Sequence, residues 1–209
     1  QLPTPPSFAQ KRGVGMWRYA ELLPIRDSSR AITLGEGGTQ LHLCNRLSDR
    51  IGLRRLWVKD ETRNPTGSFL DRGVSVEVSW AVEKGYREVC CASSGNLGAS
   101  AAAYAARAGL LARVFVPSDI DVGKLCQIIA YGAELEVAKT HREAHELAES
   151  CAKASWRRLL TPANPFFLEG IKTVGYEICE SFGWRCPDWV VAPMGNGGLI
   201  SMVWKGYLE

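Results

Sequence analysis

Residues 55–85 read RLWVKDETRNPTGSFLDRGVSVEVSWAVEKG and divide into a strand, a turn and a helix. The apolar "RLWVKDE" (55–61) is typical of a strand, whereas "DRGVSVEVSWAVEKG" (71–85) favours a helix. Between them, Asn-Pro-Thr-Gly-Ser is turn chemistry, because proline fixes one φ angle and glycine permits another. Leu70 therefore stands at a strand-to-helix junction, where α/β proteins place their chemistry, yet a leucine does no acid–base or nucleophilic work.

The same alternation of short apolar runs and longer helical segments continues along the chain. The expected strand and helix pairs are 87–92 with 95–109, 111–117 with 121–132, 133–138 with 142–156, and 188–193 with 197–209. A short helix is expected at 17–25, and a glycine turn running into a strand at 33–43. Such alternation predicts right-handed crossovers and a mostly parallel sheet flanked by helices, so the fold class is α/β.

Three loops that follow expected strands are rich in glycine, serine or asparagine: 64–69, 93–98 and 194–198. Ligands of open α/β sheets bind beyond the carboxyl ends of the strands. We therefore expect the three loops to converge on one site.

The loop "APMGNGGLI" (192–200) suits an anion such as a phosphate, because its backbone N–H groups and the following helix N-terminus attract negative charge. Its donors would be the amides of Gly195, Asn196, Gly197, Gly198 and Leu199. Ile200 breaks the dinucleotide-binding pattern and no GK[ST] follows, which argues against a nicotinamide or nucleotide cofactor. A plain glycine turn is the competing interpretation.

The loop "SSGNLG" (93–98) offers exposed amides and the Asn96 side chain. It could hold a carboxylate on backbone N–H groups while Asn96 donates to a phenolic oxygen. A helix N-cap by Ser93 or Ser94 competes with that interpretation.

Bulk properties exclude several classes of protein. The chain has 209 residues, 46% of them hydrophobic, and a formal charge of +3 without a basic stripe, so neither a nucleic acid nor a membrane is an expected partner. The uncharged stretch 89–106 is broken by Gly95 and Gly98 and is not a membrane span. The proline-rich residues 1–13 predict neither a signal peptide nor a spanning helix, so we expect a cytoplasmic protein.

Seven cysteines without CxxC spacing and three histidines give no convincing metal site. His141 and His145 are four residues apart, but their surroundings favour a solvated helix face. We expect no metal, and reduced, mostly buried thiols.

Five ordered motifs give the chain a resemblance to a known family. They are "VKDETRNPTGSFLDRG", "ASSGNLGASAAAYAARAGL", "VGKLCQIIAYGAELE", "NPFFLEGIKTVGYEI" and "DWVVAPMGNGGLISMVWKGYLE". In this order they resemble the threonine synthases, which belong to the tryptophan-synthase-β-like (type II) pyridoxal-phosphate enzymes. The resemblance covers nearly the whole chain and implies the type II fold, with two domains of mostly parallel sheets flanked by helices.

The resemblance also implies roles for individual residues. Residues 195–199 would hold the phosphate of pyridoxal 5'-phosphate, and Asn96 would meet the pyridine hydroxyl. Ser93, Ser94 and Gly95 would cradle the substrate carboxylate, and Lys124 could face the substrate phosphate, although an exposed lysine at a helix start is the plainer interpretation. The implied reaction converts O-phospho-L-homoserine and water into L-threonine and phosphate. The resemblance also implies a cytoplasmic protein that forms a homodimer.

Leu70 occupies the position of the family's Schiff-base lysine, so this chain as written would have almost no turnover. An engineered substitution, a lineage that lost catalysis, or a cofactor-bearing lysine written as leucine would each explain it. The matching residues around Leu70 favour the first or the third explanation.

Other departures affect the substrate. Thr161, Pro162, Phe167 and Ile171 stand where the family is expected to bind the substrate phosphate through Asn, Ser and Arg. A sister enzyme acting on another amino acid, by β-replacement on phosphoserine or deamination of a hydroxy amino acid, and a catalytically inactive relative therefore remain as alternatives.

The resemblance also suggests a division into domains. Residues 1–70 with 161–209 would form a larger cofactor-binding domain, incomplete at the C-terminus. Residues 71–160 would form a smaller βαβ domain.

Overall fold

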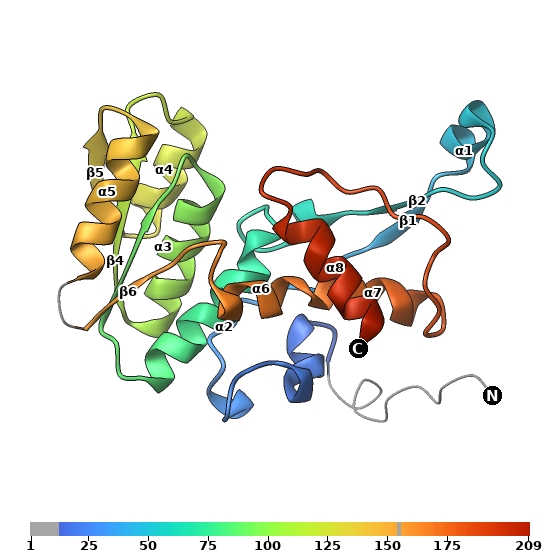
Figure 1. Cartoon of the computed structure of the whole chain (residues 1–209), viewed down its shortest axis with the longest axis horizontal. Coiled ribbons are helices and arrows are strands. Elements are labelled where there is room, and N and C mark those ends of the chain that lie inside the picture. The colour runs from blue at the N-terminus through green and yellow to red at the C-terminus, as the bar shows by residue number, and fades with distance from the viewer. Residues whose placement is uncertain (1–12, 154–155) are drawn as a thin grey trace.

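A computed structural model describes residues 13–153 and 156–209 as two lobes (Figure 1). One lobe contains a four-stranded sheet, and the other contains a two-stranded sheet and the C-terminal helices. Helix α2 (Leu70–Glu83) packs against α3 (Asn96–Ala108) of the first lobe and α6 (Pro165–Ile171) of the second. Its residues 71–79 are all buried, so this part of α2 is surrounded by protein.

The four-stranded sheet is parallel, as the alternation predicted. It consists of β3 (Glu88–Ala92), β4 (Leu111–Pro117), β5 (Glu134–Ala138) and β6 (Arg157–Leu159), in the order β5-β4-β3-β6. Sequence reasoning had not assigned β6. The α/β class is confirmed.

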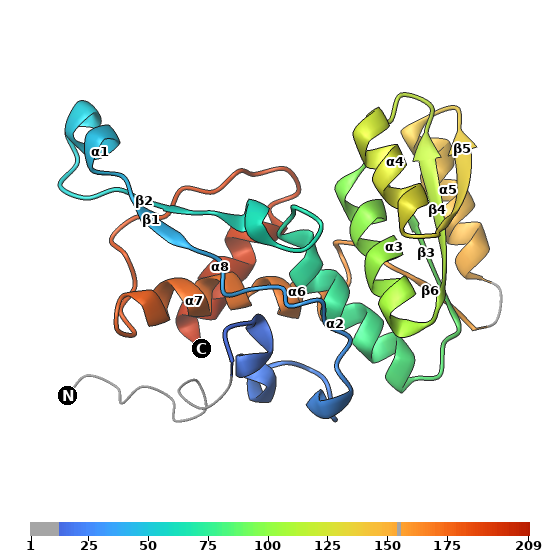
Figure 2. The same ribbon diagram turned by 180° about the vertical axis from the view of Figure 1, so that it is seen from behind.

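Helices cover both faces of this sheet. Successive side chains of a strand point to opposite faces, so Val89 and Cys91 face one core cluster while Cys90 and Ala92 face another. The first cluster includes residues of α2, α3 (Asn96–Ala108) and α4 (Val122–Ala130), and the second includes α5 (His141–Ala152). Figure 2 shows α3 and α4 in front of the sheet and α5 behind it.

The second lobe surrounds the other side of α2. It contains η1 (Met16–Leu22), η2 (Ser28–Arg30), β1 (Leu41–Leu43), α1 (Asn45–Ile51), β2 (Trp57–Lys59), η3 (Glu61–Arg63), α6 (Pro165–Ile171), α7 (Thr173–Ser181) and α8 (Gly198–Leu208). Strands β1 and β2 are antiparallel and form a ribbon that carries α1 at its tip (Figure 1). The short helix expected at 17–25 is a 3-10 helix.

The strand expected at residues 188–193 is wrong, because this segment is irregular. Trp189 is 88% exposed and Val191 is 97% exposed. A strand is stabilised by a hydrogen-bonded neighbour, and the described residues provide none for this segment. An apolar, β-branched sequence alone does not supply the neighbouring strand with which a strand forms its hydrogen bonds.

The expectation of mostly buried thiols is wrong for several cysteines. All seven are free, Cys90, Cys91 and Cys179 are buried, and Cys126 and Cys186 are exposed. In the described ranges, no helix is long and apolar enough to cross a membrane. The expectation that residues 1–13 form neither a signal peptide nor a spanning helix lies outside the described residues, except at Gly13.

The predicted division into residues 1–70 with 161–209 and residues 71–160 stays a prediction. Helix α2 begins at the first of these boundaries and packs on both lobes, so it belongs structurally to each of them.

Candidate functional site

A buried carboxylate holds the turn that precedes α2. Asp71 accepts hydrogen bonds from the Thr66 backbone N–H at 2.8 Å and from the Thr66 hydroxyl at 2.6 Å. It also accepts one from the Ser100 hydroxyl of α3 at 2.6 Å. Burial raises the pKa of Asp71 even though these donors favour the ionised form. Asp71 therefore joins the 64–69 turn to both α2 and α3.

Leu70 is the first residue of α2 and is half-buried. Its backbone N–H donates to the Ser68 hydroxyl at 3.2 Å, and its side chain packs against the larger core cluster. A helix start held in this way gives residue 70 a defined position. The side chain at that position is a hydrocarbon.

The 93–98 loop is capped by a side chain within the loop. The Ser93 hydroxyl accepts from the N–H groups of Gly95 at 3.0 Å and Gly98 at 2.8 Å. Ser93 is buried, whereas Ser94 and Asn96 are exposed. The N-cap residue of α3 is Gly95, two residues after the expected Ser93, but the Ser93 hydroxyl still serves as a capping group because it accepts from the first-turn N–H of Gly98. The two exposed side chains face solvent.

Lys124 connects the 93–98 loop to the 64–69 turn. A Cβ on Gly95 would lie 3.2 Å from Cγ of Lys124, so the lysine stem covers this glycine. Its Nζ lies 3.4 Å from the Thr66 carbonyl oxygen and 3.1 Å from Oε1 of Gln127. Lys124 is half-buried and aimed between two of the three loops, so it is more than an exposed lysine at a helix start.

The third loop lies at the start of α8, on the side of its lobe that faces the four-stranded sheet (Figure 1). Within the described residues, no hydrogen bond joins it to the other two loops. The Asn196 side chain accepts from the Gly198 N–H at 3.0 Å, and Leu199 packs against the larger core cluster. The convergence of all three loops on one ligand stays a prediction.

This third loop nevertheless has room for an anion. A Cβ placed on Gly195 or Gly197 would meet nothing within 4 Å, and Gly197 adopts φ +83°, which favours glycine. The loop also opens an 11-residue helix, whose N-terminus favours negative charge. The residues at 195–199 therefore fit a phosphate group.

Helix α6 supports the helices that follow two of the loops. A Cβ on Gly73 of α2 would lie 2.7 Å from the Phe167 ring, and one on Gly198 would lie 3.4 Å from Cδ2 of Leu168. The first turns of α2 and α8 thus rest on neighbouring residues of α6. Residues 70 and 198 are positioned by the same element.

Two of the four residues expected near a substrate phosphate help to build the core, and the other two form a turn. Phe167 and Ile171 are each 1% exposed and belong to the larger core cluster. Thr161 forms a turn, with its carbonyl accepting from the Asn164 N–H at 3.0 Å. Pro162 follows in the same turn and is half-buried.

Sequence reasoning missed a buried charge cluster around Arg72, two residues after Leu70 in the chain. The Arg72 guanidinium is fully buried and donates to Glu61 at 2.7 and 2.8 Å, to Glu177 at 2.8 and 2.9 Å, and to the Thr173 hydroxyl at 3.0 Å. Lys59 adds a contact of 2.7 Å to Glu177. An arginine within a helix as apolar as α2 was the available sequence signal.

The electrostatic effect of this cluster is mutual. Burial alone would raise the pKa of Glu177, but Arg72 and Lys59 lower it to about 2. Burial alone would lower the pKa of Arg72, whereas Glu177 and Glu61 raise it. Arg72, Glu177 and Glu61 are therefore charged at neutral pH, and each depends on the others.

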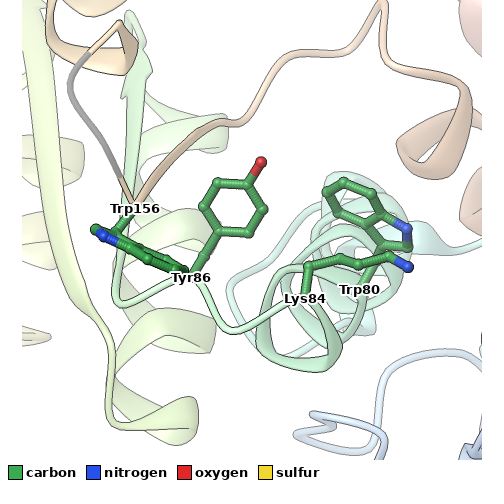
Figure 3. A pocket seen from close by; sticks show the side chains of 4 residues that line it. All are labelled: Trp80, Lys84, Tyr86 and Trp156. Atoms are coloured by element: carbon green, nitrogen blue, oxygen red, sulfur yellow. The ribbon is translucent and has the colours of Figure 1, made fainter.

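Two surface cavities lie away from the predicted site residues. One, of about 410 Å³, is lined by Trp80, Lys84, Tyr86 and Trp156 (Figure 3). The other, of about 320 Å³, lies between η1, β2 and α7, and its lining includes Arg18, Lys59 and Glu180. Neither is lined by any residue of the three loops.

Comparisons with known proteins identify the family. A family model described as "Pyridoxal-phosphate dependent enzyme" matches residues 32–209. The threonine synthase of Methanocaldococcus jannaschii is 46% identical over 202 residues, which cover 96% of this chain and 50% of that protein. The threonine synthase of Halalkalibacterium halodurans is 42% identical over 204 residues, covering 97% of this chain and 57% of that protein. The chain thus spans about half the length of these curated relatives.

Solved structures share the fold. Cysteine synthase from Entamoeba histolytica has a TM-score of 0.75 and 25% identity, covering 82% of this chain and 54% of that one. Diaminopropionate ammonia lyase from Escherichia coli has a TM-score of 0.75 at 20% identity, covering 85% of this chain and 57% of that one. The second likeness supports the fold alone.

Proposed function

The chain belongs to the family of pyridoxal-phosphate dependent enzymes, and we propose that it is the threonine synthase-like part of a lyase. The reaction proposed for this site, when residue 70 is a lysine, converts O-phospho-L-homoserine and water into L-threonine and phosphate. The observation that carries the proposal is the 46% identity to a threonine synthase over 96% of this chain. The protein is further proposed to be a cytoplasmic homodimer. Sedimentation velocity tests the dimer, which would have twice the mass of one chain.

The cofactor is proposed to bind through its phosphate at residues 195–199. The open space at Gly195 and Gly197 and the N-terminus of α8 support this assignment. Asn96 is proposed to meet the pyridine hydroxyl, and its exposed position at the start of α3 leaves its side chain free of the core. When bound, pyridoxal phosphate supplies an electron sink for charge that develops next to the substrate nitrogen.

The substrate is proposed to lie over the 93–98 loop. In this proposal Ser93, whose hydroxyl already accepts from the N–H groups of Gly95 and Gly98, shapes the loop together with Gly95. The exposed Ser94 side chain is proposed to face the substrate carboxylate. Lys124 would place one positive charge beside the Thr66 carbonyl, within reach of a substrate phosphate. These residues bind and orient the substrate, and none of them replaces a base at residue 70.

Leu70 does not fit covalent attachment of the cofactor, so we derive no chemical step through it. A leucine offers neither an amine nor a proton acceptor, and general acid–base assistance alone is worth roughly 10²–10⁴ in rate. The protein with Leu70 is therefore proposed to bind the cofactor without a covalent bond and to lack turnover.

A sister activity on another amino acid is the second candidate. The apolar, buried Phe167 and Ile171 favour it, because these positions offer no donor to the phosphate of phosphohomoserine. Phosphoserine and threonine are the substrates that distinguish this candidate from the first.

The experiment compares the full-length protein with its Leu70→Lys variant. Leu70→Met is the matched control, because methionine has an unbranched side chain like that of lysine but no amine. Each protein is mixed with pyridoxal phosphate, reduced with borohydride and mapped by mass spectrometry. We expect a pyridoxyl group on residue 70 only in L70K. We also expect phosphate release from phosphohomoserine to be at least about 10²-fold faster in L70K than in the other two.

Several results would contradict the proposal. Phosphate release by the Leu70 protein at the L70K rate would show that residue 70 is not the reacting position. If L70K carries no pyridoxyl group and retains no cofactor on gel filtration, the protein is a catalytically inactive relative of the family. Faster turnover of phosphoserine or threonine than of phosphohomoserine by L70K would select the sister activity.

A further inference from the structure

We propose that Cys179 and Cys186 are a reversible dithiol–disulfide pair that responds to small-molecule disulfides. Cys179 lies in the last turn of α7, and Cys186 lies five residues beyond the end of that helix. Their sulfur atoms are 3.5 Å apart, although both thiols are free. Cys90 and Cys151 also interact, but neither of them is exposed, whereas Cys186 is.

The backbone between the two cysteines is folded back and held by hydrogen bonds. The Cys179 carbonyl accepts from the N–H groups of Phe182 at 3.0 Å and Trp184 at 2.7 Å. Gly183 and Trp184 adopt φ angles of +65° and +63°. A tryptophan in this left-handed region is uncommon, so the reversal is imposed by its surroundings.

The pair needs little movement to form a covalent bond. A disulfide has sulfur atoms about 2.05 Å apart, so the sulfurs must approach by roughly 1.5 Å, within the reach of rotation about their Cα–Cβ bonds. Cys186 lies in an exposed, irregular segment that can accommodate this shift.

The different exposures of the two thiols assign their roles. Cys186 is exposed, whereas Cys179 is 6% exposed, and burial raises the pKa of Cys179 to about 12. The thiolate of Cys186 is therefore the group that meets a dissolved reagent first. Tyr207 of α8 is the titratable group near both thiols, and its buried oxygen has no hydrogen-bond partner within the described ranges.

The exchange balances with a small-molecule disulfide, RSSR, as the oxidant. The Cys186 thiolate attacks one sulfur of RSSR, which forms a mixed disulfide and releases RS⁻. The Cys179 thiol then loses its proton and attacks the Cys186 sulfur, which forms the protein disulfide and releases a second RS⁻. The two cysteines are oxidised, RSSR is reduced to two RSH, and the two cysteine protons end on the two released thiols.

The disulfide would stabilise the beginning of an otherwise poorly held segment. Figure 1 shows that the chain after α7 runs from the far end of its lobe back to the start of α8. Trp189 and Val191 in this segment are exposed. Closing an eight-residue ring raises the folding equilibrium constant by roughly 60-fold in the chain-entropy account.

The test incubates the full-length protein in mixtures of oxidised and reduced glutathione, followed by alkylation and peptide mapping under non-reducing conditions. We expect a peptide linking Cys179 to Cys186 in the unaltered protein and in Cys126→Ser, but not in Cys186→Ser. Cys126 is the matched control because it is also exposed and lies on α4. Urea unfolding should show the roughly 60-fold stabilisation on oxidation in the first two proteins only.

The result that overturns the proposal is alkylation of both Cys179 and Cys186 after oxidation. A Cys186–glutathione adduct that never resolves, or a disulfide between another pair of cysteines, would also refute it. Peptide mapping of the folded, unaltered protein decides the matter even if a variant is unstable.

Discussion

Replacing Arg72 by glutamine removes a buried charge from the helix that carries residue 70. Arg72 is completely buried, and its guanidinium neutralises Glu177, whose side chain is 2% exposed, and Glu61, whose side chain is 16% exposed. Glutamine keeps part of the side-chain length but provides no charge. Two carboxylates would then share a buried region with Lys59 as the remaining cation in contact.

The expected loss follows from the pKa of Glu177. Its pKa is lowered from 4.5 to about 2 in the folded protein, which corresponds to about 3 kcal/mol of stabilisation of the ionised form. Breaking a buried ion pair by removing one partner costs roughly 3–5 kcal/mol. We expect Arg72→Gln to lower the free energy of unfolding by about 3 kcal/mol at pH 7, near the lower end because Lys59 still contacts Glu177.

The pH dependence gives the prediction a second signature. A carboxyl group with a depressed folded-state pKa stabilises the fold above its unfolded pKa, and that stabilisation is lost as the pH falls toward its folded pKa. The difference between the unaltered protein and R72Q should therefore be complete at pH 7. It should shrink as the pH is lowered from about 4.5 toward 2.

Urea denaturation followed by circular dichroism measures both effects. Arg142→Gln is the control, because the Arg142 side chain is 89% exposed and pairs with Glu146 one helical turn away. Such a pair contributes at most about 0.5 kcal/mol. A loss below about 1 kcal/mol in R72Q, or a loss that does not change between pH 7 and pH 3, would refute the electrostatic account of this cluster.

Three further substitutions test separate features. Burial raises the pKa of Glu77 to about 8, so stability should fall as the pH rises from about 4.5 through 8, and Glu77→Gln should abolish this slope in pH-dependent urea titrations. Gly170→Ala should lower the thermal unfolding midpoint, because the added Cβ would clash with the backbone oxygen of Arg72 in α2. Gly123→Ala is the control and should be tolerated, because its Cβ would meet only the side-chain carboxylate of Asp121. Equal midpoints for the two variants would disprove this. Ser93→Ala should cost about 1 kcal/mol through the lost helix cap while Ser94→Ala costs less than half of that, and the reverse order in urea unfolding would contradict the assignment of the cap.

Much of the fold was predictable because its signals are local. The runs at 87–92, 111–117 and 133–138 became β3, β4 and β5 within one residue at each end. The same pattern at 188–193 gave no strand, because a strand also needs a neighbour that its own residues do not encode. The short β6 was missed because "RRL" carries no alternation that marks a strand.

The candidate site divides in the same way. The glycine and serine loops were recognisable because turn conformations and helix N-termini depend on a few consecutive residues. That the Ser93 hydroxyl serves as a cap, and that Phe167 and Ile171 are buried, required the packing of α3 and α6. Residue type did not distinguish a side chain that faces a ligand from one that faces the core.

The sequence by itself determined the alternation of strands and helices, the positions of the three loops and the leucine at residue 70, because each is a property of neighbouring residues. The tertiary structure decided which of these features meet. Lys124 reaches Thr66 across 58 residues, and Arg72 reaches Glu177 across 105. Such contacts are fixed by the burial of whole helices against a sheet, which no short stretch of sequence contains.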